Sequence, residues 1–537
     1  MTIGTWLRAS AAVLGSIGSA RTWAVPPKYE GPSDPESKIV RPLPAEPPRP
    51  PRLDSGMFNN DIDRFIAARW KEFDAAPARV ADDWTFIRRV ALDIGGVIPP
   101  LETIGRFMAN RKRVDREEVI DHLLDSDRYA DHWTTFWGDW LCEETHSEGA
   151  APFAFRDYIR SSLKANKPYD AWVREMIVGE GDAGAAGLIL RQRNRADELT
   201  IAVSQVFLGT QLKCAQCHDH PFEPWLQTDF LAMQAFWKGT RLQPIEAPAG
   251  DSQTPGGTRR YLTVADGGRP SAEARFITGA ASEQTGRRAL AELMTRRDNP
   301  YFARVAVNRL WAKLMGTGLV NPTDGFTPRN PPSHPELLDW LAVTFVDSGY
   351  DLKQIIRLIC NSRTYQLETR GGRRGGAPDD LPLFETMQLR RLTAEQLHDS
   401  ILICCGLYGT GQQWRPAIES RYPAPPGSFL ATFGSHDRQT IHERDADGTI
   451  PQALELLNGW FLNNAVSGAQ HPARGWTRAG DSRETVATKL FLLTLTREPT
   501  PYELSTVLGS IKTGNPDENW ADVHWALINT REFMFIR

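Results

Sequence analysis

The feature that most constrains this fold is a helical spacing of apolar residues, which begins near residue 57 and continues almost to residue 537. Its clearest instance is Trp133, Phe136, Trp137 and Trp140, which stand at i, i+3, i+4 and i+7 and therefore share one helix face. An aromatic face of this kind more often packs in a core than against a cofactor. The pattern predicts a mainly α-helical protein with an aromatic-rich core.

Residues that begin or end helices flank several of these apolar runs. Ser333 with Glu336, and Thr393 with Gln396, have the spacing of capping boxes. A helix is predicted over residues 196–212, which would present the following Cys214 from a rigid element. Further helix starts are predicted at Asn59-Asn60 and Asp82-Asp83, with a stop at Gly95-Gly96.

The composition divides the chain into five segments. Residues 1–24 are predicted to be a signal peptide, because Arg8 precedes a short apolar run and small residues follow it. Residues 25–56 are a Pro-rich linker. Two packed helical domains, 57–238 and 287–537, are then expected, joined by a Gly/Pro-rich, partly extended segment over 239–286 with one short strand at 261–264.

The overall composition excludes several classes of protein. Hydrophobic residues at 41% and charged residues at 24% are ordinary for a soluble globular protein. A formal net charge of −4 gives no reason to expect a nucleic acid as partner. No apolar run is long enough to span a bilayer. The six cysteines are too few for a disulfide scaffold, and Cys142, Cys360, Cys404 and Cys405 are predicted to be buried thiols.

The candidate functional site is the stretch from Cys214 to Trp225, which contains the pattern Cys-x-x-Cys-His. Two thiols at this spacing can form thioethers to the two vinyl groups of one porphyrin, and the adjacent histidine can then bind the iron. The pattern therefore predicts haem c held by Cys214, Cys217 and His218. The same spacing also serves zinc sites and dithiol chemistry.

Three functional classes stay open on these residues. The first is a haem c protein that transfers electrons, with or without an oxidoreductase activity. The second is a non-haem metalloprotein in which Cys214, Cys217, His218 and His220 hold zinc or iron. The third is a binding or scaffold protein in which Cys214 and Cys217 form a structural disulfide.

The order of motifs resembles a family architecture that is abundant in planctomycetes. In it, a cytochrome c-like (PSCyt-type) domain is followed by a planctomycete-specific (PSD-type) domain, both of unknown function. The matching stretches are Ile62-Asp63-Arg64-Phe65-Ile66, Arg88-Arg89 with Leu92-Asp93, Cys214 to Trp225, Asn299 to Trp311, His334 to Leu341, Arg391 to Gln396 and Gln452 to Asn458.

This resemblance implies an exported, periplasmic or extracytoplasmic protein that is often encoded beside a sulfatase-like partner. Many relatives have Cys-x-Cys-Glu-Arg shortly before the last of these stretches. The present chain has Thr440-Ile441-His442-Glu443-Arg444 there, so His442 stands where the relatives have a thiol. His442 is therefore a candidate metal ligand.

The ligand on the distal side of the haem iron has two candidates. Met233 is predicted to lie on the helix that follows the motif, and could bind as in Met/His cytochromes. His442 is the preferred choice, because it replaces a residue type able to bind metal. His220 is a poor candidate, because it lies two residues from His218 and is followed by Pro221.

Overall fold

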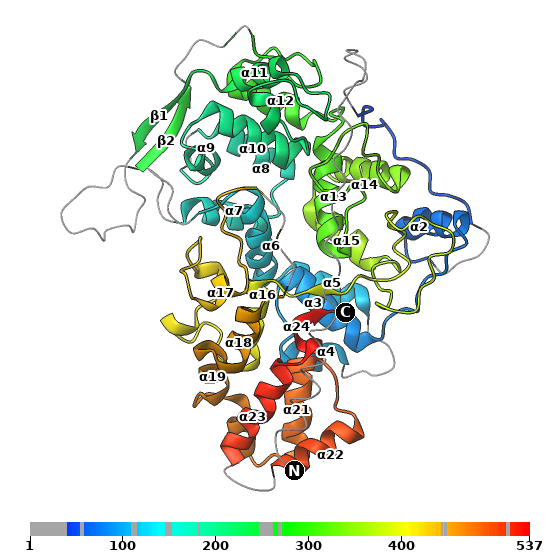
Figure 1. Ribbon diagram of the computed structural model, residues 1–537, viewed down its shortest axis with the longest axis vertical. Helices are drawn as coiled ribbons and strands as arrows, with labels where there is room; N and C mark the ends of the chain where they lie inside the picture. Colours follow the sequence, from blue (N-terminus) through cyan, green and yellow to red (C-terminus); the bar gives the residue numbers. More distant parts are fainter. Residues whose placement is uncertain are drawn as a thin grey trace, which may run out of the picture.

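The structure is a computed structural model. It describes residues 40–53, 58–108, 115–144, 153–180, 183–245, 261–266, 271, 273–441, 444, 448–511 and 516–537. Within these ranges the protein is mainly α-helical, as predicted, and its longest axis runs vertically in Figure 1.

The helices begin with residues that satisfy their free backbone N–H groups. Asn60 accepts a hydrogen bond from the backbone N–H of Ile62, and Asp82 accepts one from Thr85 at 2.7 Å. Before residue 239 the helical elements are α2 (Asp61–Glu72), α3 (Asp83–Gly95), α4 (Leu101–Met108), α5 (Arg116–Leu124), α6 (Asp127–Trp140), α7 (Ala154–Lys164), α8 (Tyr169–Val178), α9 (Gly187–Arg191), α10 (Ala196–Leu208), η2 (Lys213–Gln216), α11 (Gln227–Gln234) and η3 (Ala235–Trp237).

The second half of the chain is built in the same way. Thr393 and Gln396 form the predicted capping box, with hydrogen bonds of 3.0 and 3.3 Å. The elements are α12 (Gly286–Thr295), α13 (Phe302–Met315), α14 (Pro335–Asp347), α15 (Leu352–Asn361), α16 (Ala394–Cys404), η4 (Gln412–Trp414), η5 (Ala417–Glu419), α17 (Phe429–Thr432), α18 (Ile450–Asn458), α19 (Trp460–Ser467), α20 (Pro472–Arg478), α21 (Arg483–Leu495), α22 (Pro501–Ser510), α23 (Pro516–Ile528) and α24 (Arg531–Met534).

Strands contribute two small antiparallel ladders. The predicted strand is present as β2 (Tyr261–Asp266), and it pairs with β1 (Thr240–Ile245). The other ladder joins β3 (Arg390–Arg391) to β4 (Phe535–Ile536), which brings the end of the chain back beside the start of α16.

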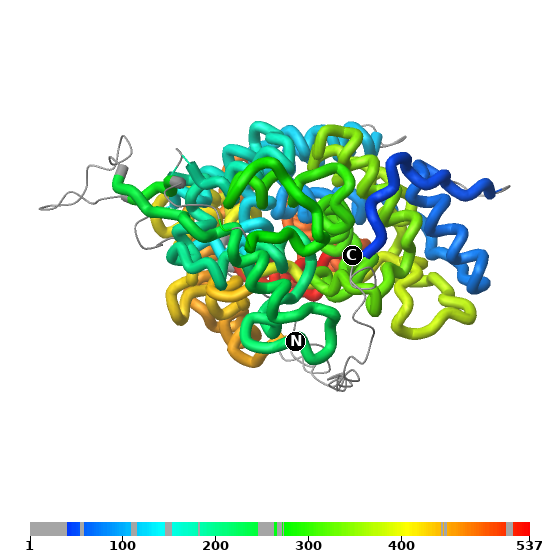
Figure 2. The backbone as a smooth tube through the Cα atoms, turned by 90° about the horizontal axis from the view of Figure 1, so that it is seen from above, coloured from blue at the N-terminus to red at the C-terminus, as the bar shows by residue number. Residues whose placement is uncertain are grey.

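The buried apolar side chains form two clusters. The first extends along the chain from Leu43 to Met387, and the second is formed mainly by residues 392–536. In Figure 1 the second cluster corresponds to the lower lobe, α16 to α24, while α3 to α6 lie between the lobes. Seen from above, α2 lies beside the yellow-green segment near residue 370 (Figure 2), where Ala76 pairs with Arg373.

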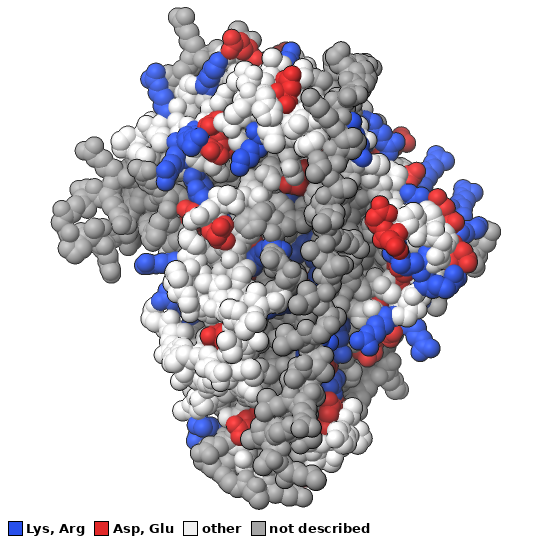
Figure 3. All heavy atoms as spheres, in the orientation of Figure 1, with Lys and Arg blue, Asp and Glu red and all other residues white. Residues whose placement is uncertain are grey.

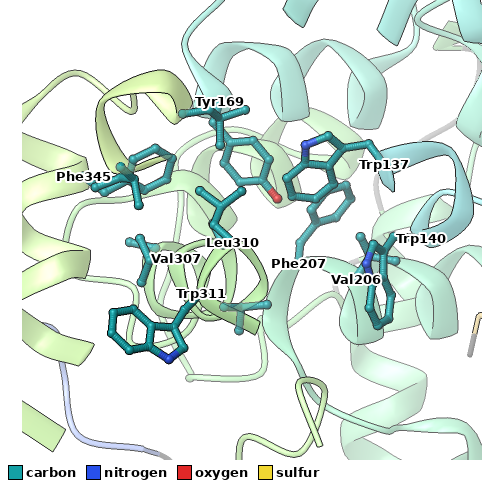
Figure 4. Close-up of a cluster of buried hydrophobic side chains, with 14 of the residues drawn as sticks. Trp137, Trp140, Tyr169, Val206, Phe207, Val307, Leu310, Trp311 and Phe345 are labelled. Carbon is teal, nitrogen blue, oxygen red and sulfur yellow. The ribbon is translucent and has the colours of Figure 1, made fainter. Parts of the chain in front are cut away.

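The first cluster mixes residues from both sides of the 239–286 segment. Figure 4 shows Trp137, Tyr169 and Phe207 packed close to Leu310 and Phe345. The predicted aromatic face is in this cluster: Trp133, Trp137 and Trp140 are 1%, 0% and 9% exposed. The clusters of buried side chains therefore divide near residue 390, a different place in the chain from the predicted linker.

Helix α3 connects the two clusters through consecutive arginines. Arg88 donates hydrogen bonds to the backbone carbonyls of Thr494 and Phe533 at 2.9 and 2.8 Å. Arg89 points the other way and donates to the carbonyl of Leu367 at 2.8 Å. Both guanidinium groups are buried, and their donors satisfy carbonyls that no water reaches.

Two predicted helix boundaries are wrong. Helix α10 ends at Leu208 rather than near residue 212, because Gly209 adopts a left-handed conformation with φ of 61°. The predicted box at Ser333 is absent from the described structure: His334 is the N-cap residue of α14, its side chain makes no capping bond, and Pro335 follows it.

The described surface carries both signs of charge. Acidic and basic side chains are interspersed on the face shown in Figure 3. Among the described helices, none is both long and apolar enough to cross a bilayer.

Candidate functional site

The Cys214 motif lies on a loop between α10 and α11, and a tight turn at Gly209 separates it from α10. A side chain at Gly209 would collide with Phe326 and Val305, whose atoms lie 2.7 and 2.8 Å from the position of a Cβ. The chain then forms the short 3-10 helix η2, which contains Cys214. The motif is thus presented by η2 and its loop, and not by a continuation of α10.

The three predicted haem-binding side chains are exposed together. Cys214, Cys217 and His218 are exposed, and both thiols are free. The residues between and around them anchor the loop, because Leu212 and Ala215 are fully buried and Trp225 is 1% exposed. The loop therefore combines an apolar anchor with reactive side chains that face solvent.

Hydrogen bonds from the start of α11 fix the shape of this loop. The side-chain amide of Gln227 donates to the carbonyl of Cys217 at 3.0 Å. The backbone N–H of Gln227 donates to the carboxylate of Asp219 at 2.9 Å. Farther along, the N–H of His220 donates to the carbonyl of Trp225 at 2.8 Å. The backbone of the motif is thus ordered by the protein's own groups.

The ring of His218 has a defined protonation pattern. Its Nδ1 lies 2.7 Å from the backbone carbonyl of Asp219, and a carbonyl can only accept. Nδ1 therefore carries the proton, and in the neutral ring Nε2 has a free lone pair. Nε2 has no hydrogen-bond partner among the described residues, so it is available to a metal ion. Fixing a ligand ring through the backbone in this way is typical of metal-binding histidines.

His220 has the opposite pattern. Its Nδ1 lies 3.2 and 2.9 Å from the backbone N–H groups of Phe222 and Glu223, which can only donate. Nδ1 is therefore the acceptor, and the neutral ring carries its proton on Nε2. Burial, and then the charge of His218, lower the pKa of His220. In this conformation His220 closes a turn and offers no lone pair to a metal.

Of the two candidate ligands for the distal side of the haem iron, the structure describes Met233 but not His442. Met233 is on α11, as predicted, but it is 1% exposed and packs inside the first cluster. Its side chain is therefore buried, whereas Cys214, Cys217 and His218 are exposed. His442 lies outside the described residues. Its neighbour Ile441 packs against the first cluster, and the carbonyl of Ile441 is 3.5 Å from the side-chain nitrogen of Gln205 at the end of α10.

Two family models match the chain, one after the other. PSCyt2, a protein of unknown function (DUF1549), matches residues 61–242, and PSD1, a protein of unknown function (DUF1553), matches residues 286–511. The chain is a PSCyt2–PSD1 protein. The predicted resemblance, a PSCyt-type domain followed by a PSD-type domain, is therefore confirmed. No curated protein and no solved structure matches the chain.

In this PSCyt2–PSD1 protein the motif loop belongs to PSCyt2, but PSD1 residues support it. The guanidinium of Arg329 donates to the carbonyl of Phe222 at 3.0 Å. The N–H of Phe326 donates to the carbonyl of Gly209, at the other end of the loop, at 2.9 Å. Glu223, next to Phe222, interacts with Thr327 and Arg329 of PSD1; burial raises the pKa of its carboxyl, and these two residues lower it. The loop is therefore shaped by both domains.

A second group of metal-binding side chains is buried in the lower lobe. In the described part of the chain, one group of at least three His, Cys, Asp or Glu residues has its ligand atoms within 4.8 Å of one another: Cys404, Cys405 and His524. The prediction that both cysteines are buried is confirmed. Sequence reasoning missed their neighbour His524, because it lies more than a hundred residues away and no local spacing links it to them.

Proposed function

We propose that this PSCyt2–PSD1 protein is an exported haem c-binding protein that performs electron transfer or another redox reaction. Cys214 and Cys217 would hold the haem by thioether bonds, and His218 would bind the iron. The observation that supports this most directly is the ring of His218, whose Nε2 is left free by the bond from Nδ1 to the carbonyl of Asp219.

The donor set of the loop fits this group. The thiols are free and exposed, as attachment by an external maturation system requires. Leu226 and Leu231, just after the motif, are 38% and 48% exposed, and an apolar macrocycle would cover apolar side chains of this kind. When bound, haem c would supply a one-electron redox centre. The chain itself would hold the ring of His218 and order the loop.

The two alternatives have weaker support. A zinc or iron site made by Cys214, Cys217, His218 and His220 needs the lone pair of His220 Nδ1, which two backbone N–H groups occupy. No three of these four residues have ligand atoms within 4.8 Å of one another in the described structure. A structural disulfide would join Cys214 to Cys217, which are both free thiols here.

Export is part of the same proposal. The family resemblance implies an exported protein, haem attachment to such a motif would take place outside the cytoplasm, and the first 24 residues have the pattern of a signal peptide. Mass spectrometry of the native protein should find a new N-terminus between about residues 20 and 30. A mature protein that retains Met1 would contradict export.

The decisive experiment is co-expression with a cytochrome c maturation system, followed by denaturation and a test for covalently retained haem. The wild-type chain should retain it, and Cys214→Ala with Cys217→Ala should abolish retention. Cys142→Ala, which removes a buried thiol elsewhere, is the matched control and should change nothing.

Two further variants test the axial ligands. His218→Ala should remove the proximal ligand and alter the spectrum strongly. His442→Ala should leave retention intact and change only the spectrum of the reduced form, whereas Met233→Leu should not change it. Colourless protein with one zinc per chain that is lost in Cys214→Ala with Cys217→Ala would support the metalloprotein alternative, and colourless, metal-free protein with a Cys214–Cys217 disulfide would support the scaffold.

A further inference from the structure

The lower lobe contains a group of soft ligands that the proposed haem site does not use. Cys404 is the last residue of α16, and Cys405 is its C-cap residue. His524 comes from α23, which packs against α20 and α21. All three residues are 0% exposed and belong to or adjoin the second apolar cluster. Three potential ligand atoms therefore lie close together in the buried interior of the lower lobe.

The imidazole of His524 is oriented by a second histidine. Nε2 of His471, at the start of α20, lies 2.7 Å from Nδ1 of His524. This bond occupies Nδ1, so Nε2 is the nitrogen left to bind elsewhere. Nε2 is fully buried and has no hydrogen-bond partner among the described residues. A buried polar nitrogen without a partner requires an explanation, and a bound ion is one that fits the two neighbouring thiols.

The spacing and chemistry of the three ligand atoms fit one metal ion. Around a trigonal centre with sulfur at about 2.3 Å, ligand atoms lie about 4 Å apart, a little closer than the 4.8 Å limit within which these three lie. Two thiolates and an imidazole, with no carboxylate, favour soft ions with a closed d shell. We propose that Cys404, Cys405 and His524 form a buried structural site for such an ion. Cu(I) is favoured over Zn(II), because structural zinc sites almost always have four ligands.

The charges of the proposed site can be balanced. Binding of Cu(I) would displace one proton from each thiol, so two protons leave for each ion bound. The resulting centre has one net negative charge, which is costly in a dry interior unless a cation is near. The guanidinium of Arg88, buried on α3, is close enough to Cys404 for their charges to interact. His471 would act as the positioning residue by accepting the proton of His524 Nδ1.

The experiment is an anaerobic titration of the full chain with Cu(I), and separately with Zn(II), against a chromogenic chelator. It is done in the Cys214→Ala, Cys217→Ala background, so that the exposed thiols do not contribute. One ion per chain should be retained, and Cys404→Ser with Cys405→Ser should abolish retention. His471→Gln should weaken affinity by about 10- to 100-fold. Cys360→Ser, another fully buried thiol, is the matched control and should bind normally.

X-ray absorption on the metal-loaded background protein keeps the proposal testable even where the core variants fail to fold. It should show two sulfur ligands at about 2.3 Å and one nitrogen at about 2.0 Å. Zinc bound with the same dependence on Cys404 and Cys405 would support the site and assign it to zinc. Retention that survives Cys404→Ser with Cys405→Ser, an all-oxygen coordination shell, or no binding of either ion would overturn the proposal.

Discussion

His334 illustrates how a single buried side chain can make this fold sensitive to acid. It is 2% exposed, and its Nδ1 lies 3.1 Å from the hydroxyl of Ser333. Burial, and then the charge of Arg69, lower its pKa to about 3. The unfolded chain binds a proton near pH 6.5 instead. The stabilisation from a neutral His334 is therefore complete above about pH 6.5, and it is lost progressively as the pH falls towards 3.

We predict that His334→Asn makes the protein less sensitive to acid. Between pH 7 and pH 4.5, the wild-type His334 should lower the free energy of unfolding by about 2.5 kcal/mol, and the variant should lack this loss. Asparagine is also a favourable N-cap residue, so α14 should be retained. Urea unfolding at pH 7 and at pH 4.5 measures the free energy of unfolding of the wild type and of the variant. His122→Asn, on the more exposed helix α5, is the control and should lose as much stability as the wild type between pH 7 and pH 4.5. A loss in His334→Asn equal to that of the wild type would refute the argument.

At the scale of elements, local residue patterns predict some helix boundaries and miss others. The box at Thr393 needs only Gln396, three residues later, and it is present. The end of α10 is marked locally by Gly209 in a left-handed conformation, although the predicted helix continues past it; the side chains of Phe326 and Val305, which leave no room for a Cβ at Gly209, come from the other half of the chain. No local pattern in 196–212 reports those contacts.

The capping box of α16 supplies a prediction for one element. Thr393→Ala removes the hydroxyl that accepts the N–H of Gln396, and the N–H would then lack a partner. The free energy of unfolding should fall by about 1 kcal/mol. Thr488→Ala, a partly exposed position within α21, is the matched control and should change stability by less than about 0.5 kcal/mol. Chemical denaturation measures both variants. Equal changes in the free energy of unfolding would show that the capping box does not stabilise the protein.

At the scale of the whole molecule, the sequence indicates which residues are chemically reactive. It does not indicate which residues that are far apart in the chain come into contact. The Cys214 motif is contained in one loop, so its exposed thiols and histidine could be proposed from local spacing alone. The support of that loop by Phe326 and Arg329 depends on how the two domains pack, and so does the meeting of Cys404 with His524. The same packing places both domains' side chains in one apolar cluster.

A buried ion cluster is one of the polar contacts between the two lobes. Glu143, at 0% exposure, accepts hydrogen bonds from Arg156 at 3.0 Å and from Arg438. Arg438 is also fully buried, and it donates to Asp139 at 3.1 Å and lies 3.6 Å above the ring of Tyr422. Glu143 lies three residues after the end of α6, and Arg438 lies in the segment after α17. The cluster therefore ties residues of the first apolar cluster to the lower lobe.

We predict that Glu143→Gln is strongly destabilising and uncouples the lobes. It leaves Arg156 and Arg438 buried with one fewer carboxylate, and breaking a buried ion pair in this way costs about 3–5 kcal/mol. Because the lost contact joins the two clusters of buried side chains, unfolding in urea should change from one transition to two, with the lower lobe unfolding first. Asp127→Asn removes an exposed partner of Lys164 and should leave the unfolding curve close to that of the wild type, without adding a transition. A Glu143→Gln variant that unfolds in a single transition, within 1 kcal/mol of wild type, would mean that apolar packing alone holds the lobes together.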